Sequence, residues 1–311
     1  MKLISIAVPC FNEEEIISAF YNILSKVIKN EMKDLKFEII FIDDGSSDNT
    51  LNVIKELSKK DNRVKYISFS RNFGKEAAIY AGLKNSSGDC VITMDVDLQD
   101  PPSLIPTMIS YINEGYDCVA TKRSSRKGEP ILRSFFSNAF YNIINKLSET
   151  KIVNGARDYR VMKRPMIDSI LEMEEYNRFS KGIFTWVGFE TKWIEYNNIE
   201  RPIGKSKWSF FKLLKYSFEG ITSFSTTLLH FATVFGLIIA IISLILIVLV
   251  MLRTLIFGDS VAGWTSTISA ILFIGGVQLF CIGLLGQYIS KIYLETKNRP
   301  IYITKETNIF F

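Results

Sequence analysis

Residues 37–44, with the sequence Phe-Glu-Ile-Ile-Phe-Ile-Asp-Asp, decide the fold because they join a short apolar run to two acids. Residues 90–97, Cys-Val-Ile-Thr-Met-Asp-Val-Asp, repeat this arrangement. Both apolar runs are rich in β-branched residues and too short for helices, which is typical of buried strands. In open α/β sheets, ligands bind in the crevice beyond the carboxyl ends of the strands. The acidic groups Asp43-Asp44 and Asp95-Val96-Asp97 are therefore predicted to lie at a ligand site.

Strand and helix signals alternate through the first 120 residues or so. Strands are expected at 4–8, 37–42, 64–69, 90–94 and 117–121, and helices at 13–30, 48–60, 75–85 and 103–114. This alternation favours an α/β domain with a mostly parallel sheet and helices on both faces. Beyond it, a helix is expected at 131–148, a polar loop entering a short apolar run at 156–161, and another strand at 190–196.

Two long stretches without Asp, Glu, Lys or Arg follow, at residues 220–252 and 260–290. Each exceeds the roughly 20 residues that cross a bilayer. Two transmembrane helices are predicted, at about 228–252 and 266–290, after an amphipathic juxtamembrane segment at 206–227. Lysines and arginines flank the pair, whereas the linking loop carries only Arg253 and Asp259, so both chain ends are predicted to be cytoplasmic. Residues 291–311 are expected to form a short, loosely ordered tail.

Composition narrows the class of protein. The chain has 311 residues, 48% of them apolar, which suffices for one globular domain of about 200 residues and a membrane part. The first residues lack the small-residue cleavage site of a signal peptide, so the large domain is expected in the cytosol. The four cysteines have neither disulfide nor zinc spacing and are interpreted as buried apolar groups in a reducing compartment. The net charge of +5 is modest, and no nucleic-acid partner is predicted.

Two features have more than one interpretation at this level. Asp95 and Asp97 can share a divalent cation, and hard oxygen ligands suit Mg²⁺ or Mn²⁺ bridging a diphosphate, yet acids in turns are often merely solvated. Five bases lie between residues 122 and 133, where they are either a solvated loop or a phosphate-binding segment.

Four motifs, in this order along the chain, resemble the family 2 glycosyltransferases of the GT-A fold. They occur at residues 8–14, 43–48, 70–75 and 94–102. More narrowly, they are similar to the polyprenyl-phosphate glycosyltransferases, which include dolichol-phosphate mannose synthase and the bactoprenol glucosyltransferases. The resemblance spans nearly the whole chain and implies a Rossmann-like GT-A domain at residues 1–205. Val96 departs from the family pattern, where Ala is more usual, and is expected to narrow the sugar pocket.

The resemblance also implies roles for individual residues. Those implied to hold the nucleotide sugar are Pro9, Glu13, Asp43, Asp44, Lys75 and Asp95. Those implied to hold Mg²⁺ or Mn²⁺ are Asp95, Asp97 and Gln99. Those implied to bind the acceptor or donor phosphate are Arg123, Arg133, Arg201 and Lys207. Asp97 and Asp158 are the implied catalytic residues, with Asp158 similar to the family's proposed base; otherwise Asp158 is a turn residue and the arginines are solvated.

The implied reaction is attack of a lipid phosphate oxygen on the anomeric carbon of a sugar, with inversion and loss of a nucleoside diphosphate. Because a phosphate monoester has a second pKa near 6, roughly, the nucleophile is already mostly dianionic at neutral pH. A strong base is then scarcely needed. Our hypothesis is that Asp158 orients the acceptor or offsets oxocarbenium charge, while the metal and arginines supply most of the electrostatic stabilisation.

The expected function is transfer of a hexose to undecaprenyl or another polyprenyl phosphate for cell-envelope glycosylation, in a multi-pass plasma-membrane protein. UDP-glucose or UDP-N-acetylglucosamine is the favoured donor, although the residues do not select the sugar. A homo-oligomer is expected, a tetramer by resemblance, and glycines of the second stretch favour close helix packing. The alternatives are a processive polysaccharide synthase, whose Gln-x-x-Arg-Trp motif is absent, and a non-catalytic nucleotide-sugar or lipid-carrier scaffold.

Overall fold

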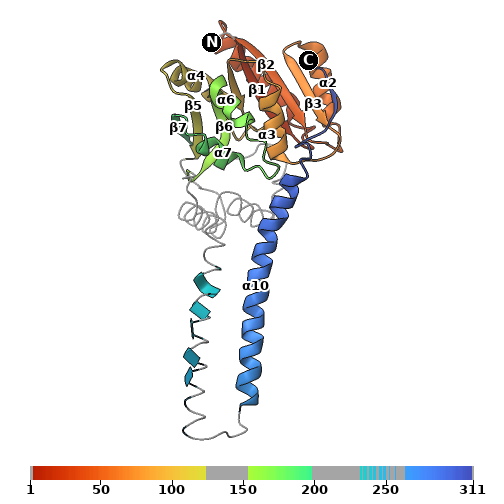
Figure 1. The fold of residues 1–311 in the computed structure, drawn as a ribbon. Coiled ribbons are helices and arrows are strands. Elements are labelled where there is room, and N and C mark those ends of the chain that lie inside the picture. The colour runs from red at the N-terminus through yellow and green to blue at the C-terminus, as the bar shows by residue number, and fades with distance from the viewer. Residues whose placement is uncertain are drawn as a thin grey trace.

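The computed structural model describes residues 3–123, 153–197 and 263–309, together with scattered positions between 232 and 256. An α/β domain carries a long helix, α10 (Trp264–Thr296), which projects away from it (Figure 1). The predicted helix at 131–148 and the amphipathic segment at 206–227 lie outside the described residues, as does most of the first predicted span.

A mixed sheet forms the centre of the domain. Within the described ranges it has eight strands in the order β7-β5-β6-β4-β1-β2-β3-β8. Their bounds are β1 Leu3–Cys10, β2 Lys36–Asp43, β3 Val64–Phe69, β4 Cys90–Thr93, β5 Cys118–Arg123, β6 Ala156–Lys163, β7 Thr191–Tyr196 and β8 Thr304–Thr307. Strands β4, β1, β2 and β3 are parallel neighbours, and so are β5 and β7, whereas β6 and β8 run antiparallel to the strands they join. The predicted α/β class with a mostly parallel sheet is confirmed.

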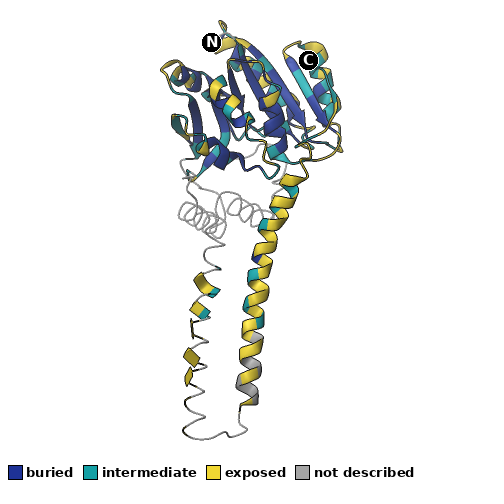
Figure 2. Cartoon of the chain, viewed as in Figure 1, coloured by how far each residue is buried: buried dark blue, intermediate teal, exposed yellow. Residues whose placement is uncertain are grey.

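Helices cover both faces of this sheet. Their bounds are α1 Ile17–Glu31, α2 Thr50–Lys60, α3 Lys75–Lys84, the 3₁₀ turn η1 Pro102–Leu104, α4 Ile105–Asn113, α6 Arg164–Leu171 and α7 Ser180–Trp186. Because side chains alternate along a strand, Ile6 and Val8 of β1 pack in one core cluster with α1 and α4, and Ala7 packs in the other with α3 and α6. Figure 2 shows the buried strands between the helical layers. Element bounds up to residue 123 agree with the sequence-based expectations to within a few residues.

Helix α1 begins later than predicted. The acids at residues 13–15 precede its first residue, Ile17, instead of lying in its first turn. The Glu14 carboxylate instead accepts a hydrogen bond of 2.7 Å from the backbone N–H of Asn49, which precedes α2. Glu14 therefore satisfies a free amide at the start of the neighbouring helix, where a negative charge is favourable.

Residues 156–161 were predicted to be a polar loop that leads into a short apolar run, and the loop prediction is wrong. They form most of β6, which pairs antiparallel with β4 on one side and β5 on the other. The strand was missed because the polar pair Arg157-Asp158 near its start is not typical of a central strand. Its antiparallel direction carries its first, polar residues to the edge where β4 ends, with Thr93 opposite Arg160.

The C-terminal tail is also not loosely ordered. Strand β8 pairs antiparallel with β3, and Lys55 forms an ion pair with Glu306 at 2.7 Å. The ring of Tyr302 stacks on Phe69 with 4.8 Å between the ring centroids. A terminal segment becomes ordered when a sheet edge and an aromatic contact hold it, as both do here.

Helix α10 is unlike the helices of the domain because its apolar side chains face outward. Residues Phe273–Thr296 have a mean hydropathy of 1.5, and only 6% of the residues in their apolar window are buried. They are the one stretch among the described residues that is long and apolar enough to cross a bilayer. Figure 2 shows exposed residues along most of its length. The helix extends beyond the predicted 266–290 at both ends. Two membrane spans are not confirmed by the described residues.

Candidate active site

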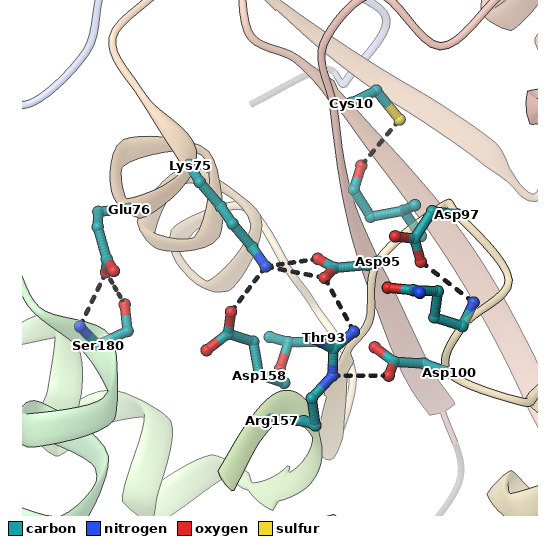
Figure 3. Close-up of polar contacts among 12 residues, drawn as sticks. Cys10, Lys75, Glu76, Thr93, Asp95, Asp97, Asp100, Arg157, Asp158 and Ser180 are labelled. Atoms are coloured by element: carbon teal, nitrogen blue, oxygen red, sulfur yellow. Dashed lines mark hydrogen bonds and ion pairs between the residues drawn. The ribbon is translucent and has the colours of Figure 1, made fainter. Parts of the chain in front are cut away.

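Charged side chains converge where β2 and β4 end and β6 begins. Figure 3 shows those that follow β4 and those of β6. Asp43 is the last residue of β2, Asp95 and Asp97 follow β4, and Asp158 lies near the start of β6. Parallel strands bring their carboxyl ends to one edge of a sheet, and the antiparallel β6 adds its amino end there. The acids predicted from the two strand motifs therefore do lie at a common edge.

The Asp43-Asp44 pair is held by backbone and hydroxyl donors. Asp43 accepts hydrogen bonds from Ser46 N–H at 3.1 Å and Ser68 O–H at 2.8 Å. Asp44 accepts one from Phe73 N–H at 2.7 Å and others from Gly74 N–H. Burial raises the pKa of Asp44 to about 6, even though both amides act in the opposite direction. In the free protein, the ionised form of Asp44 therefore lowers the stability of the fold.

Tight backbone turns bring the first motif to the same edge. Gly45 has a φ of 66°, and a Cβ atom added there would lie 2.4 Å from the carbonyl carbon of Arg71. Asn12, with a φ of 53°, accepts a hydrogen bond from Ser47 N–H at 2.8 Å. Glu13 N–H donates to Thr50 at 2.8 Å. Besides these contacts, Pro9 lies opposite Ile42 in the β1–β2 register, so Pro9, Glu13, Asp43 and Asp44 share one end of the sheet.

Lys75 lies at the centre of the charged cluster. Its Nζ atom is 2.7 Å from Asp95 Oδ1 and 2.7 Å from Asp158 Oδ2. Burial lowers the pKa of the lysine, but Asp158 and Asp95 outweigh it and raise the pKa above its usual value. For Asp158, burial raises the pKa, but the positive charges of Lys75 and Lys181 outweigh burial and hold that pKa well below its usual range. Both groups are therefore charged at neutral pH.

Asp97 and Gln99 lie in a turn beside this cluster. Gln99 N–H donates to Asp97 at 3.1 Å, and the Gln99 side-chain oxygen accepts a hydrogen bond from Arg123 at 3.2 Å. Burial, and then the neighbouring charge of Asp95, raise the pKa of Asp97. Arg123 is thus linked to the predicted metal-binding motif. Arg133, Arg201 and Lys207 lie outside the described residues.

The oxygen donors in this turn suit a hard cation. In the part of the chain that the structure describes, no three His, Cys, Asp or Glu side chains are grouped to hold a metal alone. Mg²⁺ commonly uses one or two carboxylates and completes its shell with water and substrate phosphates. The mutual repulsion of Asp95 and Asp97 is what a cation would relieve, so the residues fit Mg²⁺ or Mn²⁺ bound together with a diphosphate.

Three side chains that the sequence did not single out complete the cluster. Arg157 donates through Nε to Asp100 at 3.1 Å, and the hydroxyl of Tyr196 donates to the same carboxylate at 2.6 Å. Asp100 is fully buried. Asp100 and Arg157 adjoin residues of the predicted site, which is a usable signal, but Tyr196 comes from β7 and nothing local marks it.

The sequence model of the family described as "Glycosyl transferase family 2" matches residues 5–171. The putative glycosyltransferase CsbB of Bacillus subtilis (strain 168) is 46% identical over 307 residues, which are 99% of this chain and 92% of that protein. The chain belongs to glycosyl transferase family 2. It is also 46% identical over 305 residues to the SfII prophage-derived bactoprenol glucosyl transferase of Shigella flexneri, covering 98% of each protein.

Among solved structures, the chain is similar to a glucosyl-3-phosphoglycerate synthase of Mycobacterium tuberculosis in complex with Mn²⁺, UDP-glucose and phosphoglyceric acid. The identity is 18%, the TM-score is 0.49, and the match covers 71% of this chain and 78% of that one. The family 2 region contains Lys75, Asp95, Asp97 and Asp158. The protein is a glycosyltransferase with an α/β GT-A fold.

Proposed function

We propose that this family 2 enzyme transfers a hexose, with inversion, from a nucleotide-diphosphate sugar to undecaprenyl or another polyprenyl phosphate. UDP-glucose is the proposed donor. The observation that carries the proposal is that a polar cluster at the sheet edge and an exposed apolar helix occur in one chain that is similar over 98% of its length to a bactoprenol glucosyl transferase. A soluble acceptor would not require that helix.

On the donor side, Pro9, Glu13, Asp43 and Asp44 are proposed to hold the nucleoside. Their common position at the carboxyl ends of β1 and β2 supports this role. A bound Mg²⁺ or Mn²⁺, held by Asp95 and Asp97 with help from Gln99, would neutralise the negative charge of the departing diphosphate.

On the acceptor side, Asp158 is proposed to orient the lipid phosphate or to offset positive charge on the sugar. Its ion pair with Lys75 at 2.7 Å supports this role over that of a base, because a carboxylate facing an ammonium group gains little from taking a proton. The acceptor phosphate is mostly a dianion at neutral pH and needs no deprotonation. Arg123 and, beyond the described residues, Arg133, Arg201 and Lys207 are proposed to bind phosphate.

The tail supports the predicted membrane topology. Strand β8 belongs to the catalytic sheet, so in the proposed topology residues 304–307 are on the same side of the membrane as the domain. If α10 crosses the bilayer once toward that side, the chain must also cross in the opposite direction before α10. The uncharged residues 220–252 are the candidate for this second span. We therefore propose two spans, with the catalytic domain and both termini in the cytoplasm.

The test is transfer by the full-length protein with Mg²⁺ or Mn²⁺, undecaprenyl phosphate and a panel of radiolabelled UDP- and GDP-sugars. We expect a lipid carrying one sugar, formed fastest from UDP-glucose and with inverted anomeric configuration by NMR. A growing polymer would favour a processive synthase, and tight donor binding without product would favour a non-catalytic scaffold. Asp97→Asn is expected to abolish transfer, whereas the matched Asp34→Asn, at an exposed carboxylate away from the cluster, is not.

A further inference from the structure

The Nε side of the Arg157 guanidinium is fixed in position by Asp100, which Tyr196 in turn holds. Its Nε atom donates to Asp100 at 3.1 Å, and the Tyr196 hydroxyl donates to the same oxygen of Asp100 at 2.6 Å. Asp100 is fully buried. Burial lowers the pKa of Arg157, but the charges of Asp100 and Asp95 outweigh it and raise that pKa above its usual value. Residues of three elements, namely β6, β7 and the turn after β4, thus fix the direction of one side chain. Figure 3 shows Arg157 beside Asp100 and Asp95.

The other end of this guanidinium points into the active site and is not satisfied there. Its Nη2 atom is buried and makes no hydrogen bond within the described part of the chain. Nη2 forms an ion pair with Asp95 Oδ2 at 3.6 Å, a separation that is beyond hydrogen-bonding distance. A buried donor without an acceptor costs about 1–3 kcal/mol, and more when it is charged.

A purely structural ion pair would be arranged differently. Arginine and carboxylate pair most strongly through two parallel hydrogen bonds, but here only Nε contacts Asp100, and the second oxygen of Asp100 makes no hydrogen bond to any described residue. The guanidinium therefore does not form the two-bond pairing with Asp100, and its Nη2 atom points toward Asp95. Lys75 also contacts Asp95.

We propose that Arg157 binds the terminal phosphate of a substrate through Nη2, and that Asp100 and Tyr196 are its positioning residues. Guanidinium N–H groups match phosphate oxygens in geometry and charge. The phosphate is either the β-phosphate that leaves with the nucleotide or the phosphomonoester of the lipid acceptor, because both meet at the reacting carbon. This inference rests on the proposed function for its substrates, and its donor arm can be tested without lipid transfer.

The experiment compares Arg157→Lys and Arg157→Gln with the wild-type, full-length enzyme in detergent and Mg²⁺. Calorimetry gives the Kd of UDP and of UMP, and steady-state transfer gives KM for undecaprenyl phosphate and kcat. A lost charge-assisted hydrogen bond is expected to weaken binding of the contacted phosphate by roughly 10- to 100-fold. If the contact is to the β-phosphate, the Kd of UDP rises and that of UMP does not. If the contact is to the acceptor phosphate, KM for the lipid rises and the Kd values of UDP and UMP do not change.

Tyr196→Phe keeps the ring of Tyr196 and removes only the hydroxyl that holds Asp100. Tyr196→Phe is expected to raise the same constant that the Arg157 variants raise, either the Kd of UDP or the KM for the lipid, by several-fold. The effect on kcat is expected to be smaller. Tyr21→Phe is the matched control, because Tyr21 lies on α1, away from the cluster, and its hydroxyl donates to Asp61 at 2.7 Å. Arg63→Lys, at the arginine that pairs with Asp61, is the control for Arg157→Lys.

The proposal is overturned if neither UDP affinity nor lipid KM changes in the Arg157 variants, or if UDP and UMP weaken equally. The latter would mean that the whole nucleotide site had been distorted. If the wild-type enzyme transfers no sugar to undecaprenyl phosphate, the proposed function fails. The UDP and UMP affinities then decide the role of Arg157 by themselves.

Discussion

Replacing Asp44 by Asn is expected to stabilise the free protein at neutral pH and to weaken nucleotide binding. The Asp44 side chain is almost inaccessible, with the residue 4% exposed, and burial raises its pKa from the usual 3.8 to about 6. Such a shift corresponds to roughly 3 kcal/mol of lost stability, since each pH unit is worth about 1.4 kcal/mol. Asn retains an oxygen that can accept from the Phe73 and Gly74 amides but carries no charge to desolvate.

The sign of the pH dependence follows from the raised pKa. Below pH 4, approximately, the carboxyl group is protonated in both the folded and the unfolded chain, so its burial costs little. Between about pH 4 and 6 the unfolded chain loses the proton first, and above pH 6 the full cost is present. The Asn variant should therefore gain stability relative to wild type as the pH rises through this window.

Thermal unfolding of the full-length protein in detergent at pH 4.5 and pH 8 measures this effect. At about 2–4 °C per kcal/mol, the variant should unfold several degrees higher than wild type at pH 8, and the difference should shrink to about a third of that at pH 4.5. The Kd of UDP at pH 8 should rise at least tenfold, roughly the value of one charge-assisted hydrogen bond. The exposed Asp34→Asn serves as control. A stability difference independent of pH, or a less stable variant at pH 8, would refute the reasoning.

Three further substitutions and one chelation experiment test other parts of the structure. Lys75→Met removes the ammonium group between two carboxylates and should lower kcat at least tenfold with UMP affinity retained; unchanged turnover would contradict its central position. Gly45→Ala forces a Cβ against the backbone of Arg71 at a φ of 66° and should cost roughly 1–3 kcal/mol, seen as a lower Tm. Tyr302→Ala removes the stack on Phe69 and should reduce hydrogen-exchange protection of β3 and β8, whereas Tyr302→Phe should not. Chelation by EDTA should stop transfer and added Mn²⁺ should restore it, and transfer that persists in EDTA would argue against a metal.

The parallel half of the sheet was predictable because its signals are local. Strands β1 to β4 are short apolar runs, and their β-branched residues and flanking turns are visible without any knowledge of neighbours. The acids at the ends of β2 and β4 were predicted for the same reason, since strand ends in such a sheet share one edge. Family motifs added Lys75 and Asp158, which the structure places 2.7 Å apart.

Strands β6 and β8 were not predictable from local pattern. Strand β6 begins with Arg157-Asp158 and looks polar, yet its partners β4 and β5 satisfy its backbone on both sides. Strand β8 is a four-residue edge strand after a long helix, and only the free edge of β3 gives it a partner. Strand pairing is a property of two segments, so one segment read alone underestimates it.

What the sequence alone determined is the class of the domain, its membrane association as a prediction, and which acids gather at one edge. Apolar periodicity, residue size and charge are sufficient for these because they act within short segments. The tertiary structure decided the rest: Lys75 stands between Asp95 and Asp158, and Asp100 and Tyr196 turn Arg157 toward the same point. Those contacts join elements far apart in the chain, and their geometry exists only once the sheet has set the distances between them.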